Sequence, residues 1–370
     1  MAFTVGPTCR IEQILIEKNK LPDTFGITYL HIVSSAEVSL PTCTLSFIDP
    51  IGFMEKIGIG DGTIVSITIT TSVTKTYEFR VCKVPLRLQA GLGYTYTLEM
   101  YLNYPLYLAQ TDENSQTGPS SAAMTYIANS VGLNGSQNNI VTTADSMVWS
   151  PGGRVYSVWA RSIALRGYKS STSLMVVAVS EDGDLLYKDI SLAKIAVNVS
   201  TILTPGFVFC QEFKPTITPG VSNLTLNYDH TRYAQDLTPI AYDSIDVFPH
   251  NNSILLSSTV DSIITNGGCS FGPVLFGTTH ENYDNAVAQN VRADATYSVQ
   301  GEFLFPTSSG LSLLDAFTFE LKTQALDSQQ NNSELKIDFS GKWIVKTKMI
   351  HIEGPHFAEK IIAVKQTLSN

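Results

Sequence analysis

The first hundred residues alternate apolar and polar side chains along the chain. Val65, Ile67 and Ile69 fall on one side of their segment, and hydroxyl side chains fall on the other. A period of two is typical of half-buried β-strands. Similar segments recur, separated by turn residues, at residues 11–16, 27–33, 42–48, 77–81 and 94–102. The pattern therefore predicts about six strands that form an antiparallel barrel or sandwich over residues 1–111.

The next part of the chain, residues 112–220, mixes helical and strand patterns. Apolar side chains recur at helical spacing before Gly132 and again over residues 155–166 before Gly167, and each glycine suits the end of a helix. In the second helix we expect four inward side chains, which are Val155, Val158, Trp159 and Ile163. Apolar runs then flank the tetrapeptide at 181–184, whose Asp-Gly step favours a hairpin turn. This part is predicted to be a small α+β insertion.

Strand-like alternation returns in the last third of the chain. It occupies residues 224–228, 297–305, 317–321, 343–352 and 360–364, the last two being joined through Gly354-Pro355. These segments predict a second β region over residues 221–370, whose N-terminal edge is left open toward the middle region. The predicted fold class is mainly β, with two β regions bracketing the mixed insertion.

Composition narrows the function. The 370-residue chain is 44% hydrophobic but only 15% charged, with a net charge of -9, whereas soluble domains are roughly 25% charged. The length allows two or three domains. An acidic chain has no positive field with which to attract nucleic acid, so no specific nucleic-acid binding is expected.

The cysteines and the hydropathy pattern bear on the compartment. The five cysteines are odd in number, widely spaced and without a CxxC pair, which argues against a disulfide framework or a zinc site and favours a reducing cytoplasm. Residues 1–7 lack a secretion-signal pattern, and no segment approaches the ~18 apolar residues of a membrane helix. We expect no association with membranes.

Histidines offer the first candidates for chemistry. His351 and His356 flank Glu353 and could be metal ligands. However, no third ligand cluster accompanies them, so two histidines at the ends of adjoining strands are the preferred interpretation. The other four, His31, His230, His250 and His280, are isolated in sequence, and His280-Glu281 lacks the second histidine of a zincin motif.

Three further motifs resemble functional loops without completing them. Asp182-Gly183-Asp184 with Asp189 lacks the closing bidentate glutamate of a calcium loop. The glycine-rich residues 58–62 precede a strand and not a phosphate-binding helix. Cys269 has no evident base. A pair of hydrolytic carboxylates is a tertiary feature that the sequence does not single out, so we predict no catalytic, metal or cofactor site.

The order of these features resembles a known family. The segments that carry the likeness are residues 53–62, 77–81, 98–100, 123–128, 182–189, 299–303, 340–345 and 361–365. In this order they resemble the central baseplate hub proteins of contractile or long phage tails, the late-control D proteins, and the hub portion of type VI secretion spikes. The likeness covers nearly the whole chain, apart from residues 239–290, which do not align.

The resemblance implies a structural protein and not an enzyme. It implies two tail-tube-like antiparallel β-barrel domains per chain, so that a homotrimer forms a ring of pseudo-sixfold symmetry. Such a ring adapts a sixfold tail tube to a threefold spike or needle, supplied by a separate chain, and lets DNA pass. Its other expected partners are baseplate wedge or sheath-associated proteins, and its expected location is the virion tail baseplate, after assembly in the host cytoplasm.

Two other functions stay open on the sequence. One is another virion β protein, such as a tail tube, terminator or receptor-binding subunit. The other is a wall-degrading hydrolase.

Overall fold

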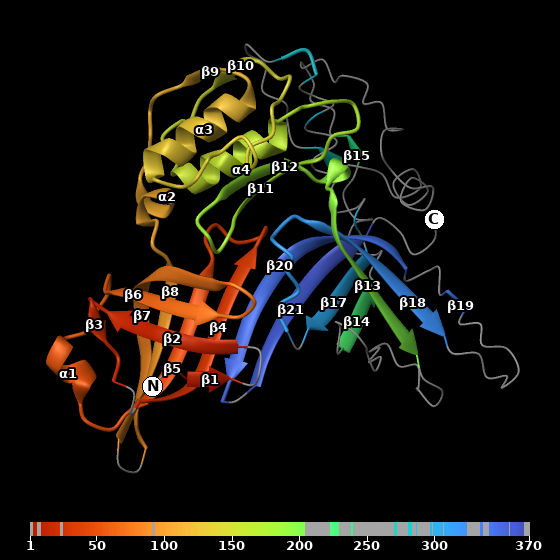
Figure 1. Ribbon diagram of the computed structural model, residues 1–370. Helices are drawn as coiled ribbons and strands as arrows, with labels where there is room; N and C mark the ends of the chain where they lie inside the picture. The colour runs from red at the N-terminus through yellow and green to blue at the C-terminus, as the bar shows by residue number, and fades with distance from the viewer. Residues whose placement is uncertain are drawn as a thin grey trace, which may run out of the picture.

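The computed structural model (Figure 1) describes most of the chain in three groups of elements. The described residues are 3–5, 9–22, 25–90, 93–203, 223–228, 238–239, 270–271, 280–282, 286, 297, 299–305, 307–323, 334–335, 340–354 and 356–365. Among them, no helix is both long and apolar enough to cross a lipid bilayer.

The first group is an antiparallel β region. Its strands are β1 (Phe3–Val5), β2 (Cys9–Ile16), β3 (Asn19–Lys20), β4 (Gly26–Ser35), β5 (Thr42–Asp49), β6 (Ile64–Thr70), β7 (Thr74–Ala90) and β8 (Gly93–Leu102), with helix α1 (Phe53–Ile57) after β5. The alternating side chains Val65, Ile67 and Ile69 are all buried and their neighbours are half-buried. The predicted period-two strands are therefore confirmed.

The second group is the mixed insertion. It comprises α2 (Pro105–Ala109), β9 (Gln116–Gly118), α3 (Ser120–Val131), β10 (Met147–Trp149), α4 (Tyr156–Arg166), β11 (Met175–Val179), β12 (Leu185–Asp189) and the short 3-10 helix η1 (Ile190–Leu192). Both predicted helices are present. The predicted inward orientation of Val158 on α4 was wrong, because Val158 is 49% exposed and Tyr156 is buried instead.

Buried hydrogen bonds fix the two helices of the insertion. The Asp145 carboxylate accepts from the backbone N–H and the hydroxyl of Ser120 at 2.8 and 2.6 Å, and so caps the start of α3. The hydroxyls of Tyr126 on α3 and Tyr156 on α4 both donate to Asp112, at 2.7 and 2.8 Å. Asp145 thus fastens the start of α3 to a later loop, and Asp112 links α3 to α4.

The third group is the second β region. Its strands are β13 (Ile195–Leu203), β14 (Asn223–Tyr228), β15 (Thr238–Pro239), β16 (Ser270–Phe271), β17 (Val299–Phe305), β18 (Ala316–Thr323), β19 (Glu334–Leu335), β20 (Gly341–Glu353) and β21 (His356–Lys365). Its core is aromatic: the Phe303 ring lies edge-on to Phe317, Phe319 and Trp343 at centroid distances of 5.0 to 5.2 Å.

One sheet runs through both β regions. β4 pairs antiparallel with β20, and the path continues from β1 through β2, β6, β7, β8, β5, β4, β20, β21 and β17 to β14. β13 leaves the insertion and pairs in parallel with β18. The predicted fold class, mainly β with an α+β insertion, is confirmed. The domain limits at residues 111 and 220 stay a prediction.

Candidate functional site

The site that unites the three groups is built on the β11–β12 hairpin. Its register pairs Val179 with Leu185 and Met175 with Asp189. Val177 and Tyr187 contribute to a core shared with the first β region. Side chains on the other face, Leu174, Ala178, Leu186 and Ile190, contribute to the core of the second β region. The hairpin is therefore wedged between the two cores.

The turn of this hairpin has the shape that its sequence predicts. Gly183 adopts a positive φ of 81°, and its N–H donates to the carbonyl of Ser180 at 3.1 Å. The Ser180 hydroxyl accepts from the backbone N–H groups of Asp182 and Asp184. Asp-Gly supplies a left-handed position at little steric cost. The predicted hairpin is confirmed, and its turn projects Glu181 and Asp182.

Glu181 enters a buried cluster of three charges. Lys348 on β20 places Nζ at 3.1 Å from Oε1 of Glu181 and at 3.8 Å from Oε2 of Glu359 on β21. The same ammonium donates to the carbonyl of Leu311 at 2.8 Å. The exposed side-chain fractions are 10% for Lys348, 4% for Glu181 and 2% for Glu359. A buried charge needs such partners, because burial alone strongly disfavours ionisation.

Electrostatics keep the Glu181–Lys348 pair ionised. Burial opposes the charged form of Glu181, but the Lys348 ammonium outweighs burial and holds the pKa of Glu181 below its ordinary value. Burial likewise opposes the charge of Lys348, yet Glu181 and Glu359 together raise the pKa of this lysine. The pair therefore carries opposite charges at neutral pH.

Weaker pairs surround the buried one. Asp182, next along the turn, lies 2.5 Å from Nζ of Lys75 on β7. Lys188 on β12 lies 4.0 Å from Asp315, just before β18. Both pairs are partly exposed, so each contributes little stability by itself. Together with Lys348, they link one hairpin of the insertion to both β regions.

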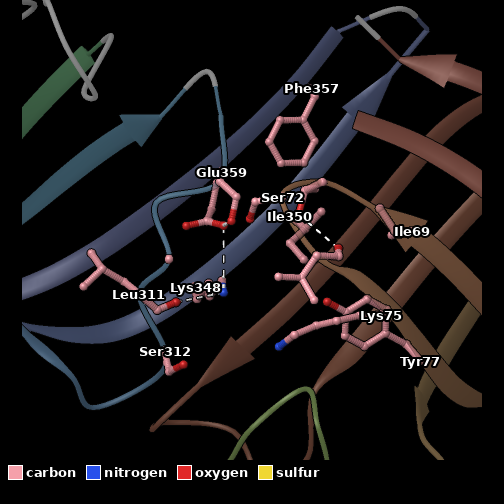
Figure 2. Close-up of a pocket in the computed structure, with 14 residues that line it drawn as sticks. Ile69, Ser72, Lys75, Tyr77, Leu311, Ser312, Lys348, Ile350, Phe357 and Glu359 are labelled. Carbon is pink, nitrogen blue, oxygen red and sulfur yellow. Dashed lines mark hydrogen bonds and ion pairs between the residues drawn. The ribbon is translucent and has the colours of Figure 1, made fainter. Parts of the chain in front are cut away.

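A cavity of about 190 Å³ lies beside the cluster (Figure 2). The β6–β7 hairpin forms one wall, and residues 308–312 with strands β20 and β21 form the others. Lys348 and Glu359 point toward each other at its base, and Lys75 and Tyr77 project from the opposite wall. The cavity thus lies between the two β regions, next to the buried cluster that links them.

The arrangement ties several segments of the chain together. Lys348 is held by three acceptors, and Glu359 also accepts from the N–H of Ser309 at 3.2 Å. The hydroxyls of Ser308 and Ser309 also donate to Glu359, and Ser309 in turn accepts from the N–H of Leu311. Within the described ranges, no three His, Cys, Asp or Glu side chains gather as a metal site would require.

The candidate histidines lie at strand ends, as the preferred interpretation predicted. His351 is near the end of β20 and His356 begins β21, where it pairs with Glu353. His31 on β4 lies directly opposite His351. His280 is buried, with Nε2 at 3.1 Å from the carbonyl oxygen of Arg166. His230 and His250 lie outside the described residues.

The other motifs have structural roles where the structure describes them. In the calcium-like loop, Asp184 accepts from the Asn134 amide at 2.5 Å, and Asp189 accepts from the N–H of Leu174 at 3.0 Å. The glycine-rich residues 58–62 connect α1 to β6, a strand, as predicted. Cys9, Cys43 and Cys82 are free thiols. Cys210 and Cys269 lie outside the described residues.

Sequence reasoning missed the buried cluster. Lys348 and Glu359 stand beside buried apolar residues of their own strands, such as Ile350 and Ile361. A charged residue at a core-facing strand position signals a buried partner. That signal could have singled out each residue, but it does not say which charges meet.

Comparison with known proteins rests on the fold. No family model matches the sequence, and none of the curated proteins matches it. Among solved structures, the 43 kDa tail protein of prophage MuSo2 from Shewanella oneidensis is similar over 98% of this chain and 99% of that one, with a TM-score of 0.58 and 10% identity. The chain has the fold of a phage tail protein.

A second tail-protein structure supports the same conclusion. The tail protein from Neisseria meningitidis MC58 covers 97% of both chains, with a TM-score of 0.56 and 8% identity. The tail-protein fold therefore spans both β regions and the insertion between them, although few residues are identical.

Proposed function

We propose that the chain is a structural hub subunit of a phage tail baseplate. The observation that carries this proposal is the tail-protein fold, which accounts for 98% of this chain and 99% of the Shewanella oneidensis protein. A match that aligns almost all residues of both chains favours a shared architecture of the whole molecule. The hub function therefore rests on analogy of fold and on the way that the insertion joins the two β regions.

The proposed assembly is a homotrimeric ring of pseudo-sixfold symmetry. Each chain contributes two β regions, over residues 1–111 and 221–370, with residues 112–220 between them. The two regions share one sheet through β4 and β20, and the buried cluster at Lys348 adds a second link. Three such chains would present six β regions at nearly fixed spacing to a sixfold tail tube and threefold symmetry to a spike.

The ring would contact other tail proteins on several sides. We place the tube protein on one face, the spike or needle on the opposite face, and wedge or sheath-associated proteins around the rim. The site of action would be the baseplate of the virion. A net charge of -9 suits a channel through which DNA slides, because acidic walls repel phosphates and do not retain them.

The subunit would act through packing and without catalysis. Permanent complexes bury roughly 2,000–5,000 Å² or more, and a ring of identical copies is closed by contacts between two different surfaces of each subunit. These requirements predict an oligomer that survives dilution.

Native mass spectrometry of the purified chain tests the proposal. We expect a mass of three chains at micromolar and at nanomolar concentration, and a larger complex after tube and spike proteins are added. A stable monomer in the presence of both partners would overturn the hub function. Six identical copies would indicate a tube subunit, and release of sugars or peptides from host wall polymer would indicate a hydrolase.

A further inference from the structure

The pairing of β4 with β20 places two histidines face to face. In this antiparallel register His31 lies directly opposite His351, and their ring centroids are 5.6 Å apart. Tyr29 packs edge-on against both rings, at 5.8 and 5.3 Å. Side chains of directly opposed residues contact each other across a sheet. This pair therefore sits on the strands that join the two β regions.

Charged groups from the neighbouring strands lie around the pair. Glu353 on β20 lies 3.5 Å from Nε2 of His351 and is a partner for its protonated form. On the side of β21, Lys360 brings a positive charge near His31 and is itself paired with Glu302 of β17 at 2.5 Å. On the side of β5, the residue opposite His31 is the uncharged Thr44.

His31 is the histidine of the pair whose pKa is lowered. Burial, His351 and Lys360, in that order, lower the pKa of His31 below its ordinary value. A group whose pKa is lower in the folded state stabilises that state above its unfolded pKa, near 6.5 for histidine. This stabilisation is lost as the pH falls through the folded pKa of His31. Acid therefore works against the β4–β20 pairing.

We propose that the His31–His351 pair is an acid-sensitive catch between the two β regions. The two rings pack against each other and against Tyr29. As the pH falls, a proton on His31 places a positive charge against the His351 ring, 5.6 Å away across β4 and β20, and near Lys360. The strands then open more often, while pairs such as β2–β6, which carry no histidine, keep their protection.

Hydrogen exchange followed by mass spectrometry tests the catch. The full-length chain is exchanged at pH 7.5 and pH 5.5, and the rates are corrected for the intrinsic effect of pH. We expect protection of β4 and β20 to fall at the lower pH relative to β2 and β6, because protonation of His31 disfavours the β4–β20 pairing. Equal protection at both pH values would overturn the proposal.

Variants separate the catch from general acid sensitivity. His31→Gln should remove the fall, and His31→Lys should loosen β4 and β20 at both pH values. His356→Gln is the matched control, because this exposed histidine faces Glu353 across β20 and β21 and lies outside the β4–β20 pair. The same fall in His31→Gln as in the unmodified chain would contradict the proposal.

A second readout reports on the pair itself. The pKa of His31, followed by the NMR signal of its ring, should rise when His351→Gln removes the opposing charge, and should not respond to His356→Gln. An unchanged pKa of His31 in His351→Gln would show that the two rings do not interact electrostatically, and would also overturn the catch. Neither readout depends on trimer formation, so failure here is distinct from failure of the hub function.

Discussion

Replacing Lys348 with methionine tests the junction between the three parts of the chain. Methionine is similar in length to lysine and fits the same space, so the change removes the charge with little change in volume. Glu181 and Glu359 would be left buried without the ammonium that lies 3.1 and 3.8 Å from their oxygens. The Leu311 carbonyl would also lose its donor.

The expected loss is large for a single substitution. Removing one partner of a buried pair costs about 3–5 kcal/mol, because the remaining charge is uncompensated. Lys346→Met is the matched control on the same strand. Its partner Glu37, at 2.7 Å, is 60% exposed, and a pair of that kind contributes about 0–1 kcal/mol.

Urea unfolding followed by tryptophan fluorescence measures the difference. Trp343 is fully buried on β20 and reports on this core. The penalty of Lys348→Met should be larger at pH 7 than at pH 5, because without the lysine nothing outweighs the burial that raises the pKa of Glu181, and protonation relieves its charge. Lys348→Met combined with Glu181→Gln and Glu359→Gln should recover much of the loss. An effect of Lys348→Met no larger than that of Lys346→Met would refute the role of the cluster.

Two further substitutions test other parts of the insertion. Burial raises the pKa of Asp112, but hydrogen bonds led by that from Tyr126 outweigh it and lower the pKa to about 2. Asp112→Asn should therefore cost about 1–3 kcal/mol at pH 7 and flatten the loss of stability in urea unfolding between about pH 4 and pH 2. An unchanged acid limb would contradict this. In thermal unfolding, Gly183→Ala should cost about 2 kcal/mol or more, because a Cβ would overlap the Tyr104 ring at a positive φ. Gly153→Ala, with open space at φ 72°, should cost only about 1 kcal/mol, and equal losses would refute the overlap.

Local patterns predicted the elements well because their causes are local. Val65, Ile67 and Ile69 alternate because one face of β6 is buried. Gly132 ends α3 because it adopts a left-handed conformation, with φ at 81°. The inward orientation predicted for Val158 was wrong because α4 buries Tyr156 and Trp159. An apolar residue at the edge of a buried helix face can point toward the core or toward solvent.

Long-range partners could not be read from the sequence. Nothing in the pattern of β4 says that it pairs with a strand some three hundred residues later, since any strand with one apolar face fits the same rule. The parallel pairing of β13 with β18 has the same cause. Lys348, Glu181 and Glu359 come from three separate segments, so their meeting is a product of the fold.

In the proposed assembly, three chains present six β regions around one channel. An electron-microscopy image of the purified oligomer, averaged without imposed symmetry, tests it directly. We expect threefold symmetry with six similar β densities alternating around a central opening. A ring of six whole chains, or three chains with only three β densities at the channel, would contradict it.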